Sequence, residues 1–168
     1  MKYKVIYSKR KTIALSIVDG GLVVKAPLKT KDEVIEAVII KHARWVGRHL
    51  ASQRRKIEMF SSLSEDDIKL LKKSARIYFK EKIEYFSQIM GIKYSRMTIT
   101  SAEKRFGSCN SKGNICFSYR LMLYPEAARE YVVVHELAHR IEMNHSPRFY
   151  KIIESVLPDY KERKRLLK

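Results

Sequence analysis

Residues 131–139, which read YVVVHELAH, constrain the fold of this chain more than any other stretch. The apolar residues around the two histidines follow a helical spacing and predict a helix that is mostly buried. Positions i and i+4 lie on one face of a helix, so His135 and His139 point to the same side. A buried imidazole without a partner is unfavourable, because the ring loses its hydrogen bonds to water. The fold must therefore supply a partner for both rings.

A single metal ion is the partner that this spacing favours. H-E-x-x-H on a helix is typical of a zinc site in which both histidines are ligands. Glu136 is rotated by about 100° from His135 around the helix, so it lies beside the metal and is not a ligand. We predict that Glu136 activates a metal-bound water for hydrolysis by accepting its proton. The alternative is a pair of core histidines that hydrogen-bond to carboxylates.

A catalytic zinc ion needs a third protein ligand and one open position. His145 is the first candidate, because it follows Asn144, a residue that tolerates the conformation at a helix end. A turn there would bring the ring back towards the metal. Glu154 is the second candidate and Glu142 the third. Imidazole ligands favour zinc, although another divalent transition metal is compatible with them.

The start of the chain is expected to form strands. Three segments alternate apolar and polar residues: residues 3–8, 12–18 and 21–27. Asp19-Gly20, between the last two segments, is a strong hairpin signal because the turn needs positive φ. We expect an antiparallel β-meander, followed by one helix over residues 30–57 with Thr30 as its N-cap.

The rest of the chain mixes helices and strands. Ser64 and Gly91 delimit a predicted helix, the first as its N-cap and the second as its stop. Residues 97–100 and 115–123 are strand-like and flank a polar loop. Helix-start signals then precede two further segments: Pro125 before the histidine helix, which should run to Asn144, and Ser146-Pro147.

The predicted fold class is therefore α+β, with the histidine helix packed on a small sheet. We divide the chain into an N-terminal region of meander and basic helix, residues 1–60, and a core, residues 61–168. We expect the two regions to form one compact unit. Cys109 and Cys116 lack the C-x-x-C spacing of a cysteine-rich zinc ribbon and are expected to be reduced thiols.

The charge of the chain predicts anionic partners. Lys and Arg number 35 against 18 Asp and Glu, which gives a net charge of +17. Such an excess attracts nucleic acid, nucleotides or an anionic membrane surface. Many of the cations between Lys41 and Lys56 belong to a basic helical face, which is either a nucleic-acid-binding surface or a solvated one. No apolar stretch has the length of a membrane span, and we expect a cytoplasmic protein.

Three motifs resemble the YgjP-like metallopeptidase family of zincin-like, SprT-related hydrolases: RFGSCNSKGNI (105–115), YVVVHELAH (131–139) and NHSPRFY (144–150). The resemblance implies a zinc site and a catalytic carboxylate, formed by His135, His139, His145 and Glu136. It also draws attention to Arg105, for which we expect a role in substrate binding. Phe106 and Tyr150 stand where the family usually has tryptophan, and both keep the aromatic character.

We therefore predict a zinc-dependent, metallopeptidase-like hydrolase whose substrate is a peptide. A nucleoside triphosphate pyrophosphatase that uses the same metal site is the alternative enzyme, because a basic chain attracts phosphates. A nucleic-acid-binding domain with a structural zinc is the non-enzymatic alternative, and it requires a fourth protein ligand. A peptidase pairs an edge strand with its extended substrate, and residues 115–121 are the predicted edge strand.

Overall fold

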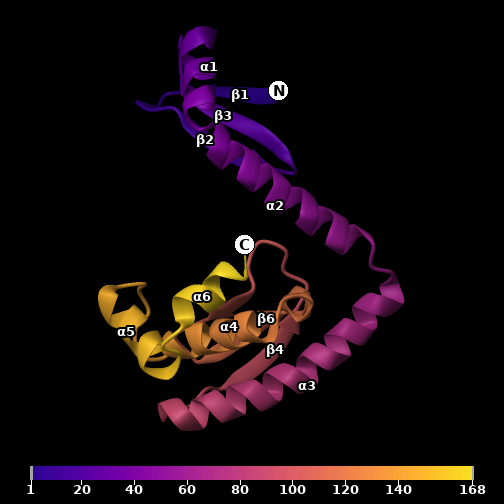
Figure 1. Cartoon of the computed structure of the whole chain (residues 1–168). Helices are drawn as coiled ribbons and strands as arrows, with labels where there is room; N and C mark the ends of the chain where they lie inside the picture. Colours follow the sequence, from indigo (N-terminus) through magenta and orange to yellow (C-terminus); the bar gives the residue numbers. More distant parts are fainter. Residues whose placement is uncertain (1, 168) are drawn as a thin grey trace. The chain divides into compact units, whose positions relative to one another are not determined.

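The computed structural model of the chain describes residues 2–167 and divides into two compact units, Met1–Leu63 and Ser64–Lys168. From the sequence we expected residues 1–60 and residues 61–168 to form one compact unit together. Each unit instead has its own three-stranded sheet (Figure 1). Among the described residues, no helix combines the length and the apolar character needed to cross a membrane.

The sheet of the first unit contains β1 (Tyr3–Ser8), β2 (Ala14–Val18) and β3 (Gly21–Pro27), in the order β1-β3-β2. β2 and β3 form the predicted antiparallel hairpin, but β1 runs parallel to β3, so the predicted antiparallel meander is wrong. β3 takes the central place because its side chains Leu22, Val24 and Ala26 are the buried ones. β1 and β2 are separated by two strand spacings, a total of about 9 to 10 Å, and residues 9–13 are long enough to cross this distance.

Two helices complete the first unit, where the sequence predicted one. α1 (Asp32–Lys41) and α2 (Ala43–Ser61) are separated at His42, whose φ of −107° is not helical. Lys31 is the N-cap of α1 and makes no capping hydrogen bond, while the hydroxyl of Thr30 donates to the carbonyl of Pro27 at 2.8 Å. Ile35, Ile39 and Val46 from both helices pack into one core with β3.

Hydrogen bonds to the β2–β3 hairpin fix the direction of α2. The side chain of Gln53 accepts a hydrogen bond from the backbone N–H of Gly20 at 3.3 Å and donates to the carbonyl of Ile17 at 3.4 Å. Four arginines of α2 are exposed: Arg44, Arg48, Arg54 and Arg55. Nucleic-acid binding by this basic face stays a prediction.

The second unit begins with α3 (Glu65–Met90), whose predicted ends are confirmed. Ser64 and Asp67 form a capping box, in which each side chain accepts the backbone N–H of the other residue. Gly91 ends the helix in the left-handed conformation with φ of 64°, which glycine adopts without a steric penalty.

The second sheet contains β4 (Arg96–Thr100), β5 (Gly107–Cys109) and β6 (Asn114–Ser118), in the order β4-β6-β5. β6 is the central strand, parallel to β4 and antiparallel to β5, so the prediction that residues 115–121 form an edge strand is wrong. β5 lies in the segment predicted to be an irregular loop. Residues 119–123 form a short 3-10 helix, η1 (Tyr119–Leu123), and do not continue the strand.

α3 and α4 (Glu126–Ala138) cover the same face of this sheet. The ring of Phe79 on α3 stacks on that of Phe117 on β6, with centroids 4.7 Å apart. Gly107 on β5 lies opposite Phe117 in the antiparallel register and faces Glu136 of α4. On the other face of the sheet, Cys116 is only partly buried. The predicted α+β class, with the histidine helix packed on a small sheet, is confirmed.

An ion-pair network joins three helices of the second unit. Glu130 on α4 accepts from Lys82 on α3 and from Arg163 on α6 (Tyr160–Arg165), each at 2.7 Å. Lys82 interrupts the apolar stripe of α3, and its pairing with Glu126 and Glu130 explains how a cation is accommodated there. These carboxylates raise the pKa of Lys82. The network holds α4 in place against its neighbours.

Candidate metal centre

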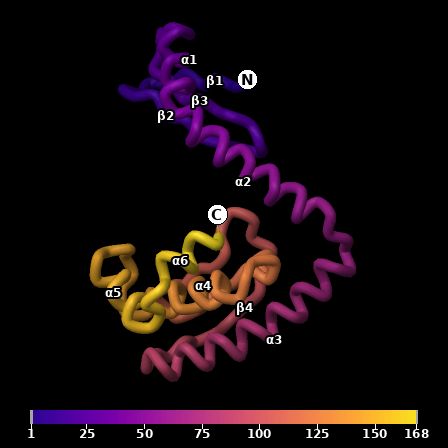
Figure 2. Tube along the Cα trace, in the orientation of Figure 1, coloured from indigo at the N-terminus to yellow at the C-terminus, as the bar shows by residue number. Residues whose placement is uncertain are grey.

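The two histidines of the H-E-x-x-H motif lie at the end of α4. The helix ends at Ala138 and His139 is its C-cap, so the prediction of a helix up to Asn144 is wrong. The N–H groups of residues 140–142 bond to the carbonyls of Leu137 and Ala138 in a tight turn. α5 (Pro147–Val156) then begins with Ser146 as its N-cap, as predicted. Figure 2 traces this passage from α4 through the turn into α5.

The turn brings three imidazoles together. A ligand nitrogen of His135, His139 and His145 lies within 4.8 Å of one from each of the others. Nε2 of His135 and Nε2 of His145 are 3.1 Å apart. Two nitrogens bound tetrahedrally to one zinc ion are about 3.3 Å apart, so the observed separation suits a shared cation.

The other residues considered as ligands are not part of this group in the described structure. Glu154 is an exposed residue of α5, and the side chain of Glu142 accepts a hydrogen bond from the N–H of Asn144 at 3.4 Å. Cys109 and Cys116 are free thiols on β5 and β6. Within residues 2–167, the histidine group therefore offers three ligands and no fourth.

The second nitrogen of two rings has a partner. Nδ1 of His139 donates to the carbonyl oxygen of Glu142 at 3.2 Å, which leaves a lone pair on Nε2. Nδ1 of His135 lies 3.4 Å from the hydroxyl of Tyr131, one turn earlier on α4. Metal-binding histidines usually have such a partner, which fixes the orientation of the ring and raises its basicity. Tyr131 was not predicted to be part of the site, although it stands four residues before His135 in the sequence.

Electrostatics also keep the rings in the form that binds a cation. Burial, and then the neighbouring His139 and His145, lower the pKa of His135 to about 3. Burial likewise lowers the pKa of His139. Both rings are thus neutral near pH 7, and neutral imidazole is the protonation state that coordinates a metal. Three imidazole nitrogens form a donor set that fits zinc or another divalent transition metal.

Phe149 of α5 forms the apolar support of the group. Its buried ring contacts all three imidazoles, with centroids 4.9 Å from His135, 4.5 Å from His139 and 4.8 Å from His145. An apolar ring on this side excludes water and restricts the imidazole rotamers. No role was predicted for Phe149, and its place in the NHSPRFY segment was the signal in the sequence that pointed to it.

Glu136 follows His135 and points towards the sheet. Its side chain is 5% exposed, and it lies so close to Gly107 of β5 that a Cβ atom added there would be 2.6 Å from its Oε1. Burial raises the pKa of Glu136 to about 8, and the nearby charge of Arg105 lowers it. Arg105 itself is exposed. A cation held by the histidines would also favour the ionised carboxylate.

Comparison with known proteins agrees with this geometry. The model of the YgjP-like metallopeptidase domain matches residues 61–168, which is more than half of the chain. The chain belongs to the YgjP-like metallopeptidase family. No match is found among the curated proteins. The crystal structure of the metallopeptidase zymogen of Pyrococcus abyssi abylysin has 24% sequence identity to the chain and a TM-score of 0.48, covering 52% of this chain and 89% of that one.

Membership of the YgjP-like metallopeptidase family implies a metal-dependent hydrolase and a divalent metal ion. The matched region contains the whole histidine group, Glu136 and the sheet on which α4 packs. The first unit lies almost entirely outside the match, so the family assignment applies to the second unit.

The contact between Gly107 and Glu136 leads to a prediction for this YgjP-like domain. Gly107→Ala is expected to displace the carboxylate, because the added methyl group overlaps Oε1, and to lower hydrolysis about 100-fold. The content of bound metal should not change, since no histidine is changed. Gly47→Ala is the control, because a Cβ at Gly47 has no neighbour within 4 Å. Equal activity of the two variants would contradict the proposed tight contact.

Proposed function

We propose that the second unit is a zinc-dependent peptidase in which His135, His139 and His145 hold the ion and Glu136 is the general base. The observation that carries this proposal is the convergence of three imidazoles, two of them from the motif that also contains the buried carboxylate of Glu136. Three protein ligands are typical of catalytic zinc, whereas structural zinc usually has four. The donor set therefore supports an enzyme over a structural zinc domain.

The metal site, Glu136 and Arg105 have different roles in the proposed reaction. A zinc ion bound here would acidify a water molecule and polarise the substrate carbonyl. Glu136 accepts the proton of the attacking water and delivers it to the leaving amine. Its burial and its contact with Gly107 restrict the carboxylate to few positions, which favours proton transfer over a fixed distance. Arg105 lies near Glu136 and is available to bind a substrate oxygen.

The position of β5 favours a peptide substrate. β5 is an edge strand, and it is the strand that lies against α4 and Glu136. An extended peptide that pairs with this edge would be held along the carboxylate by main-chain hydrogen bonds. Cleavage of a nucleoside triphosphate at the same centre has no comparable support among the described residues.

A substrate panel tests the proposal. Zinc-loaded protein is incubated with a mixed library of unstructured peptides and, separately, with the common nucleoside triphosphates, and products are identified by mass spectrometry. We expect peptide cleavage that is lost on treatment with a chelator and restored by zinc. Hydrolysis of triphosphates without peptide cleavage would replace the peptidase by the pyrophosphatase. Retention of full activity after verified removal of the metal would exclude a metal-dependent mechanism.

A further inference from the structure

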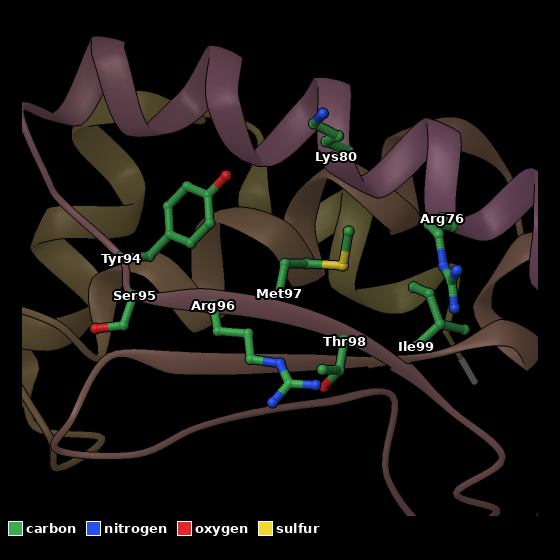
Figure 3. Close-up of a pocket in the computed structure, with 8 residues that line it drawn as sticks. All are labelled: Arg76, Lys80, Tyr94, Ser95, Arg96, Met97, Thr98 and Ile99. Carbon is green, nitrogen blue, oxygen red and sulfur yellow. The ribbon is translucent and has the colours of Figure 1, made fainter.

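A cavity of about 630 Å³ lies between α3 and the strand β4 (Figure 3). Residues 94–99 line it on one side, and the α3 side chains Arg76 and Lys80 line it on the other. We call this cavity the α3/β4 groove. None of its lining residues belongs to the histidine group, so it is separate from the metal centre.

The groove follows an open sheet edge. β4 pairs with β6 on one side, and among the described residues no strand pairs with its other side. Six consecutive residues, 94–99, line the groove, so it runs along this edge and does not sit on one face of the strand. An open edge presents unpaired backbone N–H and C=O groups, which an extended peptide can pair with as an added strand.

Cations flank the open edge on both sides. Met97 and Ile99 lie opposite Ile115 and Phe117 of β6, on the face covered by α3, where Arg76 and Lys80 are also found. Arg96 has the other parity and projects away from α3 (Figure 3). In residues 2–167, Arg76, Lys80 and Arg96 form no ion pair with a carboxylate.

The lining contains no carboxylate to compensate these three charges. Glu84 is the next residue of α3 at the spacing of Arg76 and Lys80, so it lies on the same side of the helix. Burial raises the pKa of Tyr94, which is at one end of the groove, and the negative charge of Glu84 raises it further. The groove is therefore most cationic away from Tyr94. Side chains of an added strand alternate between the two faces of the sheet, so both faces of that strand would meet a cation.

We propose that the α3/β4 groove binds an extended acidic segment of a protein, which adds as a strand to the open edge of β4. Carboxylates at both parities of the segment pair with Arg76 and Lys80 on one face and with Arg96 on the other. The backbone of β4 supplies the ladder of hydrogen bonds, and Met97 and Ile99 supply apolar contacts.

The segment bound there is a docking segment and not the one that is cleaved, a role that rests on the proposed peptidase function. β4 and β5 are opposite edges of one sheet, with β6 between them, and Glu136 lies at β5. A protein substrate with an acidic stretch would thus be held at β4 while another part of it reaches β5. This selects acidic proteins without restricting the residues next to the scissile bond.

Binding is measured by fluorescence anisotropy with a labelled peptide of repeated Glu-Glu-Val-Val, on full-length Glu136→Gln protein so that hydrolysis does not interfere. We expect saturable binding that Arg76→Glu/Lys80→Glu weakens about tenfold or more. Lys41→Glu/Lys151→Glu removes the same net charge at exposed residues outside the groove and should change Kd less than about twofold. Methylation of alternate backbone nitrogens of the peptide should also weaken binding about tenfold, because it removes ladder donors.

Three results would overturn the proposal. The two double variants could weaken binding equally, which would indicate attraction by overall charge. The N-methylated peptide could bind as well as the parent, which would exclude strand addition. A single-stranded oligonucleotide could bind the groove, sensitive to Arg76→Glu/Lys80→Glu, while the peptide does not, which would make the ligand a nucleic acid. None of these readouts depends on catalysis, so failure of the peptidase proposal is recognised separately, by the substrate panel.

Discussion

Replacement of Glu136 with glutamine is expected to lower kcat/KM for peptide hydrolysis about 10²- to 10⁴-fold while zinc stays bound. The amide has nearly the shape of the carboxylate, so the buried side chain keeps its place against Gly107. It has no basic oxygen that can take a proton from water. The histidine group is unchanged, because the Glu136 carboxylate is not one of its three members.

The control for this experiment is Glu81→Gln, the same change at an exposed position of α3. It should leave both kcat/KM and zinc content unaltered. Zinc is quantified by elemental analysis after dialysis, and turnover is measured on the substrate that the panel identifies. Unchanged turnover in Glu136→Gln would remove this residue from its role as general base, and loss of zinc in that variant would show that the carboxylate is a ligand.

Replacement of His145 with alanine is expected to lower zinc affinity by more than about 100-fold and to abolish hydrolysis at ordinary zinc concentrations. Loss of a hydrogen-bond partner behind a ligand already costs about 10- to 100-fold in metal affinity, and loss of the ligand itself should exceed this. His145 is exposed, so the fold of the second unit should survive the change. Competition with a chromophoric chelator gives the zinc affinity, and circular dichroism verifies the fold.

Glu154→Ala is the matched variant, because Glu154 was the other main candidate for the third ligand. It lies exposed on α5 outside the histidine group, and its removal should leave zinc affinity within about twofold of the parent. The reverse pattern, with zinc lost from Glu154→Ala and retained in His145→Ala, would show that the ion is held by two histidines and a glutamate.

The parts of the fold that depend on local sequence were the predictable ones. The i, i+4 spacing places His135 and His139 together on any helix, and Ser64 and Gly91 mark helix ends through interactions within a few residues. The position of His145 next to them depends only on a short turn. These features need no information about distant parts of the chain.

The features that were missed depend on contacts between distant segments. β1 pairs with β3 and not with β2, because the strand with the buried side chains takes the centre of the sheet. The break at His42 involves neither proline nor glycine, and α2 takes its direction from hydrogen bonds between Gln53 and the hairpin. β5 is only three residues long, which is too short for a periodic pattern of apolar residues to predict it. Its contact with Glu136 follows from its register with β6.

The start of α3 also bears on how this protein could be rebuilt. Ser64, the first residue of the second unit, and Asp67 satisfy each other's backbone N–H groups, so the helix needs nothing upstream to begin. A chain cut just before Ser64, or grafted there onto an unrelated leader, would keep this end of α3 intact. The second unit can therefore be fused at this junction to a different N-terminal domain without a change in its first helix.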